Sequence, residues 1–217
     1  MENKFRNYDY KDDYVYNDHT KEIKEIINGK IYYMAGGTFL HVRVIGKIAY
    51  IFNRYFDQKN SDCFADTSDL KVYLDRERSK EYVLPDIVVT CDESKVIEGG
   101  YKGDPELIVE VMSDATRRPD RMDKFELYEK SGVKEYWIVE PELKSIEQYV
   151  LSEGRYYLRE VLKLLKEDEF NNLSEEQKTN YTTIIKPAMF NDLEVDLNEI
   201  FPQKKQNNWC WRIDYYS

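Results

Sequence analysis

The stretch PELIVEVMS, residues 105–113, places a carboxylate inside an otherwise apolar run. Residues 107–112 do not alternate between apolar and polar side chains, which predicts a strand buried on both faces with Glu110 pointing into the interior. Moving an unpaired carboxylate out of water costs several kcal/mol, so Glu110 is expected to be neutralised, paired with a cation or bound to a metal. A buried salt bridge with Lys or Arg is the non-catalytic alternative.

A second acid interrupts a second apolar run. Asp86 follows Pro85 in VLPDIVVT, one predicted strand earlier in the chain than Glu110. The segment between the two acids is long enough for a strand end, a loop and a return strand, so both can converge at one edge of a sheet. Mg²⁺ favours a few carboxylate oxygens together with waters and a substrate phosphate, and it would offset the buried charge of Glu110. The alternative for Asp86 is a strand-start residue that caps a turn.

A cationic side chain follows on the next predicted helix. Arg121, Lys124 and Tyr128 share one face of that helix, which can look down on the strand ends. Two acids that hold a metal beside an ammonium group suit phosphodiester hydrolysis, because the metal activates water and the ammonium orients the hydroxide or the phosphate. A solvated lysine without a role is the alternative for Lys124. Arg117 and Arg118 are equally well explained as phosphate clamps and as solvated loop charges.

The N-terminal part of the chain predicts a hairpin and then a helix. EIKEIINGKIYYM contains two strand-like runs across Asn28-Gly29, the pair that a type I′ turn favours. Thr38 is placed to cap a helix over TFLHVRVIGKIAYIFNRYF, where apolar residues recur every three or four positions. Residues 1–19 are polar and aperiodic, and we expect a loosely attached arm.

The remaining chain mixes strands with one further helix. CFADTSDLKVYL, YVLPDIVVT and YKGDPELIVEVMS are expected to form neighbouring strands of one sheet. A helix of about three turns ends at Gly132, and EYWIVEP, SIEQYVL and RYYLREVL predict three more strands. We expect a polar insertion at about 163–183, a segment PAMFNDLEVDLNEIF that packs back, and a polar tail over 203–217.

Length and charge restrict the class of protein. A chain of 217 residues and 26.1 kDa is long enough for one domain with a full core, expected over residues 20–202. The formal charge of −10 and the isoelectric point near 4.9 weigh against tight non-specific binding of nucleic acid. A polyanionic substrate would therefore have to be held locally.

The sequence also bears on compartment and redox state. No apolar run approaches the length of a membrane span, and the first residues lack the pattern of a signal peptide. We therefore expect a cytoplasmic protein without a membrane partner. Cys63, Cys91 and Cys210 are odd in number and lack the CxxC spacing of a zinc site, which favours reduced thiols without an assigned role.

A family resemblance becomes specific at these residues. PDIVV, the stretch PELIVEVMSDATRRPDRMDKFELYEKSGVKEYWIVEP, and EIINGKIYYM followed by a helical His41 resemble the bacterial Uma-type restriction endonuclease family of the PD-(D/E)XK nuclease superfamily. The resemblance covers roughly Ile23 to Phe201, without the arm and the insertion. It implies an α/β (α+β) fold with a restriction-endonuclease-like core, a mixed central β-sheet flanked by helices and an N-terminal β-hairpin.

The resemblance also implies a site. Asp86 and Glu110 are the expected metal ligands, and Mg²⁺ or Mn²⁺ is the expected cofactor. In the superfamily's usual pattern a lysine lies two residues after the acid on the strand, where this chain has Met112, so the role passes to Lys124 on the next helix. Glu25 and His41 match polar positions of the family pattern, and they are further candidates for the catalytic site.

Three functions of different classes compete. The leading hypothesis is a metal-dependent endonuclease that hydrolyses DNA phosphodiester bonds, with RNA as an open alternative and with a symmetric homodimer favoured for cutting both strands. The second is a non-catalytic nucleic-acid-binding or regulatory module on the same fold, which the acidic surface and Met112 would allow. The third is a structural protein that assembles through Tyr-rich sheet edges.

Overall fold

The structure is a computed structural model of the chain, and it describes residues 24–27, 29–33, 37–67, 70–74, 81–112 and 119–201. The predicted arm over 1–19 and the predicted tail over 203–217 lie outside these ranges, as do Cys210, Arg117 and Arg118. The side chain of Arg121 is also outside the described part. Predictions on these residues therefore stay predictions.

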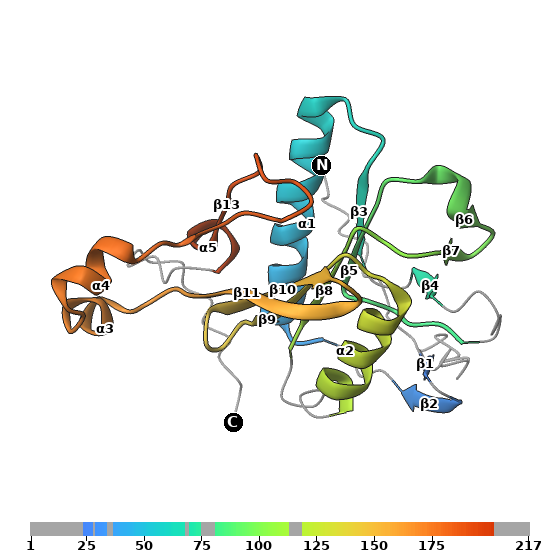
Figure 1. The fold of residues 1–217 in the computed structure, drawn as a ribbon, viewed down its shortest axis with the longest axis horizontal. Coiled ribbons are helices and arrows are strands. Elements are labelled where there is room, and N and C mark those ends of the chain that lie inside the picture. The colour runs from blue at the N-terminus through green and yellow to red at the C-terminus, as the bar shows by residue number, and fades with distance from the viewer. Residues whose placement is uncertain are drawn as a thin grey trace, which may run out of the picture.

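A six-stranded mixed sheet forms the centre of the molecule (Figure 1). Its strand order is β11-β10-β9-β8-β5-β3. Neighbours pair antiparallel except β8 and β9, which are parallel and joined through a helical crossover. The strands are β3 (Phe64–Thr67), β5 (Ile87–Thr90), β8 (Leu107–Val111), β9 (Glu135–Glu140), β10 (Ser145–Ser152) and β11 (Arg155–Lys163). Every residue of β5, β8 and β9 is buried, as the unbroken apolar runs predict.

The smaller sheets lie around this centre. The predicted hairpin is confirmed, because β1 and β2 pair antiparallel around a tight turn in which Gly29 has a φ of 74°. A three-stranded sheet has the order β4-β7-β6, and β12 pairs with β13. The bounds are β1 (Lys24–Ile27), β2 (Lys30–Tyr33), β4 (Lys71–Tyr73), β6 (Val96–Ile97), β7 (Gly100–Lys102), β12 (Ile184–Ile185) and β13 (Val195–Asp196). A short 3₁₀ helix, η1 (Glu93–Lys95), precedes β6.

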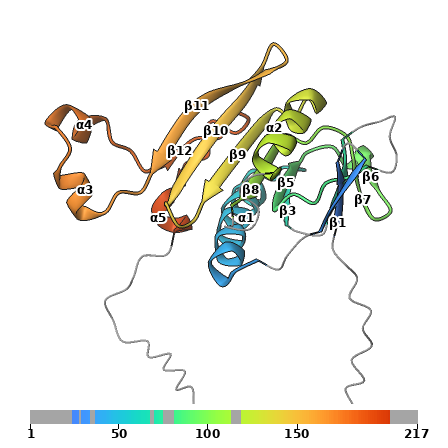
Figure 2. The same cartoon turned by 90° about the horizontal axis from the view of Figure 1, so that it is seen from below.

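Two helices cover opposite faces of the central sheet (Figure 2). The helix α1 (Phe39–Lys59) begins at Thr38, whose side chain accepts a hydrogen bond from the backbone N–H of His41, as predicted. Its apolar side packs on one face of the sheet together with α5 (Leu197–Ile200). The helix α2 (Pro119–Ser131) packs on the other face and ends before Gly132, whose φ of 88° suits a helix stop.

The polar insertion folds as two short helices. These are α3 (Glu167–Asn171) and α4 (Glu175–Asn180), which project away from the central sheet (Figure 1). The segment after them returns to the sheet, and its side chains Leu193, Val195 and Phe201 are buried in the core beside α1. The sequence prediction that this segment packs back is therefore confirmed.

Two sequence predictions are wrong. The strand β4 belongs to the small sheet with β7, not to the central one, because Val72 pairs with Tyr101 and Val83. Cys63 and Cys91 form a disulfide instead of reduced thiols. The antiparallel pairing of Phe64 with Thr90 brings these flanking cysteines opposite each other, which spacing along the chain does not reveal. No helix in the described part of the chain is both long and apolar enough to cross a bilayer.

Candidate active site

Glu110 lies at the centre of a buried polar cluster on the α2 face of the sheet. Its Oε1 accepts hydrogen bonds from Lys124 Nζ at 3.0 Å and from the Tyr128 hydroxyl at 2.6 Å. Lys124 Nζ also lies 2.9 Å from Glu25 Oε1. Lys124 is 1% exposed and Glu25 is 0% exposed, so this ion pair is sealed from solvent.

Three elements bring these side chains together. Lys124 and Tyr128 are four residues apart on α2, so both point down onto the strand that carries Glu110. The hairpin places Glu25 because Ile26 bridges to Tyr82 in the chain that leads into β5. Glu25 Oε1 also accepts a hydrogen bond from the backbone N–H of Leu84 at 2.7 Å.

Asp86 occupies the position opposite Glu110 on the neighbouring strand. The register pairs Ile87 with Val109, and one further step places Asp86 beside Glu110 on the same face of the sheet. Asp86 Oδ2 accepts a hydrogen bond from the backbone N–H of Val111 at 2.7 Å. The predicted convergence of the two acids at one sheet edge is thus what the fold produces.

His41 reaches the same edge from the other face of the sheet. Its Nε2 lies 3.3 Å from Asp86 Oδ2, and its Nδ1 is buried without a hydrogen-bond partner among the described residues. The imidazole rests against Gly37, where an added Cβ would lie 2.3 Å from Nδ1. The hydrogen bond to Asp86 raises the pKa of His41, so the charged imidazolium is favoured.

Burial dominates the electrostatics of Glu110. Loss of hydration raises the pKa of Glu110 to about 8, although the Lys124 ammonium acts in the opposite direction. The nearby carboxylates Asp86 and Glu25 also contribute to this increase. Burial also raises the pKa of Tyr128 well above 10, so this hydroxyl stays protonated and donates to Glu110. Ionised Glu110 would give the cluster three carboxylates against the two cations Lys124 and His41, and the raised pKa of Glu110 avoids this excess.

Access to the cluster is one-sided. The side chains of Asp86 and His41 are 12% and 15% exposed, whereas Glu25 and Lys124 are closed off. This exposed part of the cluster, its open side, lies at the N-terminal end of α1, because His41 stands in the first turn of that helix. A substrate would therefore reach Asp86 first and meet Glu110 behind it.

The donor set fits a hard divalent cation. Within the described residues, no group of three or more His, Cys, Asp or Glu side chains gathers as a metal site by itself. Mg²⁺ commonly uses only one or two protein carboxylates, and waters and substrate phosphate oxygens complete its shell. Asp86 and Glu110 supply two such carboxylates, and Glu25 Oε2 is a buried oxygen without a hydrogen-bond partner in the described part of the chain. A cation bound there would take the place of the proton that Glu110 otherwise keeps near neutral pH.

The structure brings together all five residues that the sequence singled out: Glu25, His41, Asp86, Glu110 and Lys124. The sequence placed Tyr128 on the helix face of Lys124 without assigning it a site role. Its spacing of four residues from Lys124 was the available signal. The backbone donors of Leu84 and Val111 have no sequence signal, because any residue except proline supplies an N–H.

A family model matches most of the chain. Residues 9–180 match the family described as "Uma2: Putative restriction endonuclease". The match begins within the N-terminal arm and includes most of the 163–183 insertion, so the likeness has different limits from the Ile23 to Phe201 that we expected.

Two individual proteins are similar to the chain. The uncharacterized protein slr1290 of Synechocystis sp. (strain ATCC 27184 / PCC 6803 / Kazusa) is 34% identical over 108 residues, which are 50% of this chain and 55% of that protein. The chain thus aligns with about half the length of this curated relative. A crystal structure described as "a putative nuclease belonging to DUF820" from Anabaena variabilis ATCC 29413 superposes with a TM-score of 0.62 at 15% identity. It covers 84% of this chain and 91% of that chain, and it shows that the two share a fold.

Proposed function

Because this chain belongs to the Uma2 family, we propose that it is a metal-dependent endonuclease that hydrolyses DNA phosphodiester bonds at the cluster around Glu110. Asp86 and Glu110 would hold Mg²⁺ or Mn²⁺. The family description and the shared nuclease-like fold support the reaction class, and the carboxylate cluster supports the metal.

Each side chain has a distinct part in this proposal. Lys124 contacts both Glu25 and Glu110, and its single positive charge offsets one of these two buried carboxylates. Tyr128 and Lys124 both bind Oε1 of Glu110, so the other oxygen of that carboxylate is left to face the ligand. His41 orients Asp86 from the solvent side. A bound divalent cation would lower the pKa of a water and stabilise negative charge on the phosphate.

One observation carries the proposal. Asp86 and Glu110 lie on one face of adjacent strands, and the pKa of Glu110 is raised to about 8 even though Lys124 contacts it. A buried salt bridge that merely stabilised the fold would balance its charges. Here a further cation is needed to keep the cluster ionised at neutral pH.

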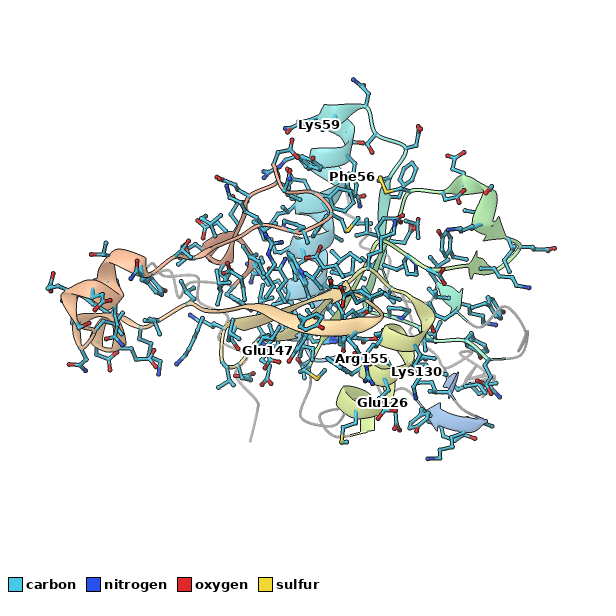
Figure 3. The ribbon with its side chains drawn as sticks, viewed as in Figure 1. Phe56, Lys59, Glu126, Lys130, Glu147 and Arg155 are labelled. Carbon is cyan, nitrogen blue, oxygen red and sulfur yellow. A yellow bond between two sulfur atoms is a disulfide. The ribbon has the colours of Figure 1, made fainter. Side chains whose placement is uncertain are left out.

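Nicking of supercoiled plasmid DNA tests the proposal. We expect the purified protein to nick plasmid with Mg²⁺ or Mn²⁺ and to stop when EDTA is added. Asp86→Ala and Glu110→Ala should each abolish nicking, and Glu110→Gln should do so while it preserves side-chain volume. Glu126→Gln is the matched control, because Glu126 is an exposed acid on the outer side of α2 (Figure 3). Metal-dependent activity that survives Asp86→Ala would contradict the assignment.

A non-catalytic nucleic-acid-binding module is the second candidate. Two observations favour it, since Lys124 is already bound between two carboxylates and Met112 occupies the position of the superfamily's usual lysine. Isothermal titration with Mn²⁺ separates the candidates. Heat of binding that Asp86→Ala removes supports the nuclease, whereas no binding supports the module.

We further propose a symmetric homodimer as the form that cuts both strands of a duplex, because each chain supplies one such cluster. Sedimentation velocity tests this assembly independently of catalysis. A monomer that converts supercoiled plasmid directly to linear product would contradict it.

A further inference from the structure

The outer face of α1 carries a regular row of basic and aromatic side chains. We call this row the α1 stripe, and it consists of Phe39, Arg43, Lys47, Tyr50 and Arg54. All five side chains are exposed, Phe39 to 81% and Tyr50 to 59%. They recur every three or four residues, so they point to the same side of the helix, opposite the residues that pack on the sheet. The stripe spans about 22 Å at 1.5 Å per residue.

The charge of this segment is opposite to that of the protein. Residues 24–56 contain five Lys or Arg residues, and the only acid is the buried Glu25, while the whole chain carries −10. An ordinary solvated helix face intersperses acids with bases, but on α1 the first acid is Asp57, beyond the stripe. The protein therefore concentrates positive charge on the segment that borders the open side of the cluster.

The aromatic rings and the cations of the stripe are coupled in pairs. The guanidinium of Arg43 lies 6.0 Å from the ring centre of Phe39, and that of Arg54 lies 5.4 Å from the ring of Tyr50. Arg54 also lies 3.7 Å from Glu199, which weakens its charge at the far end of the stripe. Arg43 and Lys47 make no salt bridge with any described residue. These two cations are placed to bind phosphates.

The stripe begins at the candidate active site. Phe39 is the first residue of α1 and lies two positions before His41, which contacts Asp86. From there α1 runs away from the site toward Lys59, which marks its opposite end (Figure 3). A strand that follows the stripe would therefore lead its backbone toward Asp86.

We propose that the α1 stripe binds single-stranded nucleic acid and guides it into the site. This inference concerns the form of the strand that enters the site, which a duplex supplies where it opens locally, and it rests on the proposed function only for the direction of the strand. Exposed aromatic rings offer stacking surfaces to unpaired bases, while Lys and Arg between them hold the backbone. In a paired duplex the bases are stacked inside the helix, so they are not available to stack on the exposed rings of Phe39 and Tyr50. A second copy of the chain fits poorly, because two positive stripes facing each other would repel.

Fluorescence anisotropy with a fluorescein-labelled oligothymidylate and a duplex of equal length tests the proposal. The measurements use full-length Asp86→Ala protein in EDTA, so that neither metal nor cleavage enters the result. We expect the single strand to bind at least tenfold more tightly than the duplex. Phe39→Ala and Tyr50→Ala should each weaken single-strand binding about tenfold, in the range of one lost base stack.

The salt dependence gives a second readout. Each phosphate contact on a single strand contributes about 0.7 to the slope of log affinity against log salt. The double variant Arg43→Gln/Lys47→Gln should therefore reduce the slope by about 1.4. The matched control is Lys102→Gln/Lys166→Gln, which removes two exposed lysines outside α1 and should change the slope little.

Three results would overturn the inference. One is an equal reduction of the salt slope in the lysine control and in Arg43→Gln/Lys47→Gln, which would indicate general charge attraction. Another is tighter binding of duplex than of single strand. The third is a wild-type dimer in sedimentation that Phe39→Ala and Tyr50→Ala dissociate without loss of nucleic-acid binding, which would make the stripe an interface between copies. Nuclease activity enters none of these readouts, so failure of the proposed reaction would not be confused with failure of the stripe.

Discussion

Replacing Glu110 by Gln should remove a pH dependence of stability that the wild type displays. The pKa of Glu110 in the folded protein is about 8, above the ordinary value of 4.5 that it regains on unfolding. Between these values the folded state keeps a proton that the unfolded state has released. The stability linked to this proton is fully present below pH 4.5, and it is lost as the pH rises toward 8.

The magnitude follows from the same linkage. One extra bound proton makes the free energy of unfolding fall by about 1.4 kcal/mol per pH unit, or about 2.7 kcal/mol between about pH 5.5 and about pH 7.5. The raised pKa of His41 acts in the same direction above 6.5, and Glu110→Gln retains that histidine. The difference between wild type and variant therefore isolates most of the Glu110 contribution.

Urea unfolding at several pH values in EDTA measures this effect. We expect a clear downward slope for wild type and for the control Glu126→Gln, and a much flatter line for Glu110→Gln. Saturating Mn²⁺ should flatten the wild-type slope as well, because a cation that binds the ionised carboxylate competes with the proton. Equal slopes for wild type and Glu110→Gln in EDTA would refute the inference that burial keeps this carboxyl protonated.

Two further predictions concern stability. Lys124→Met should lower the free energy of unfolding at neutral pH by about 3–5 kcal/mol, because it leaves Glu25 and Glu110 buried without their cation. Thermal melting measures this change. A shift in melting temperature smaller than that of an exposed lysine variant would contradict it. Replacing both Cys63 and Cys91 by Ser should cost about 3.5 kcal/mol, since the disulfide closes a loop of 28 residues in the unfolded chain. Urea unfolding without reductant checks this, and equal midpoints would count against the bond.

Local sequence patterns determined much of the fold. The turn at Gly29, the Thr38 cap and the Gly132 stop fix three element boundaries by short-range geometry. These features depend on φ preferences and on neighbouring N–H groups, so a few residues suffice to specify them. The sheet to which β4 belongs could not be predicted in this way, because strand pairing is a long-range choice.

The sequence by itself determined that Glu110 and Asp86 are acids in apolar strands, and the cost of burying charge made them candidates for one site. Only the tertiary structure decided the partners, by setting the register of β5 on β8 and by bringing Lys124 and Glu25 to the same carboxylate. The disulfide likewise depends on strand pairing, which brings Cys63 and Cys91 together. The physical reason is that composition fixes what a side chain can do, whereas distances between remote residues arise only when sheets pair and helices pack.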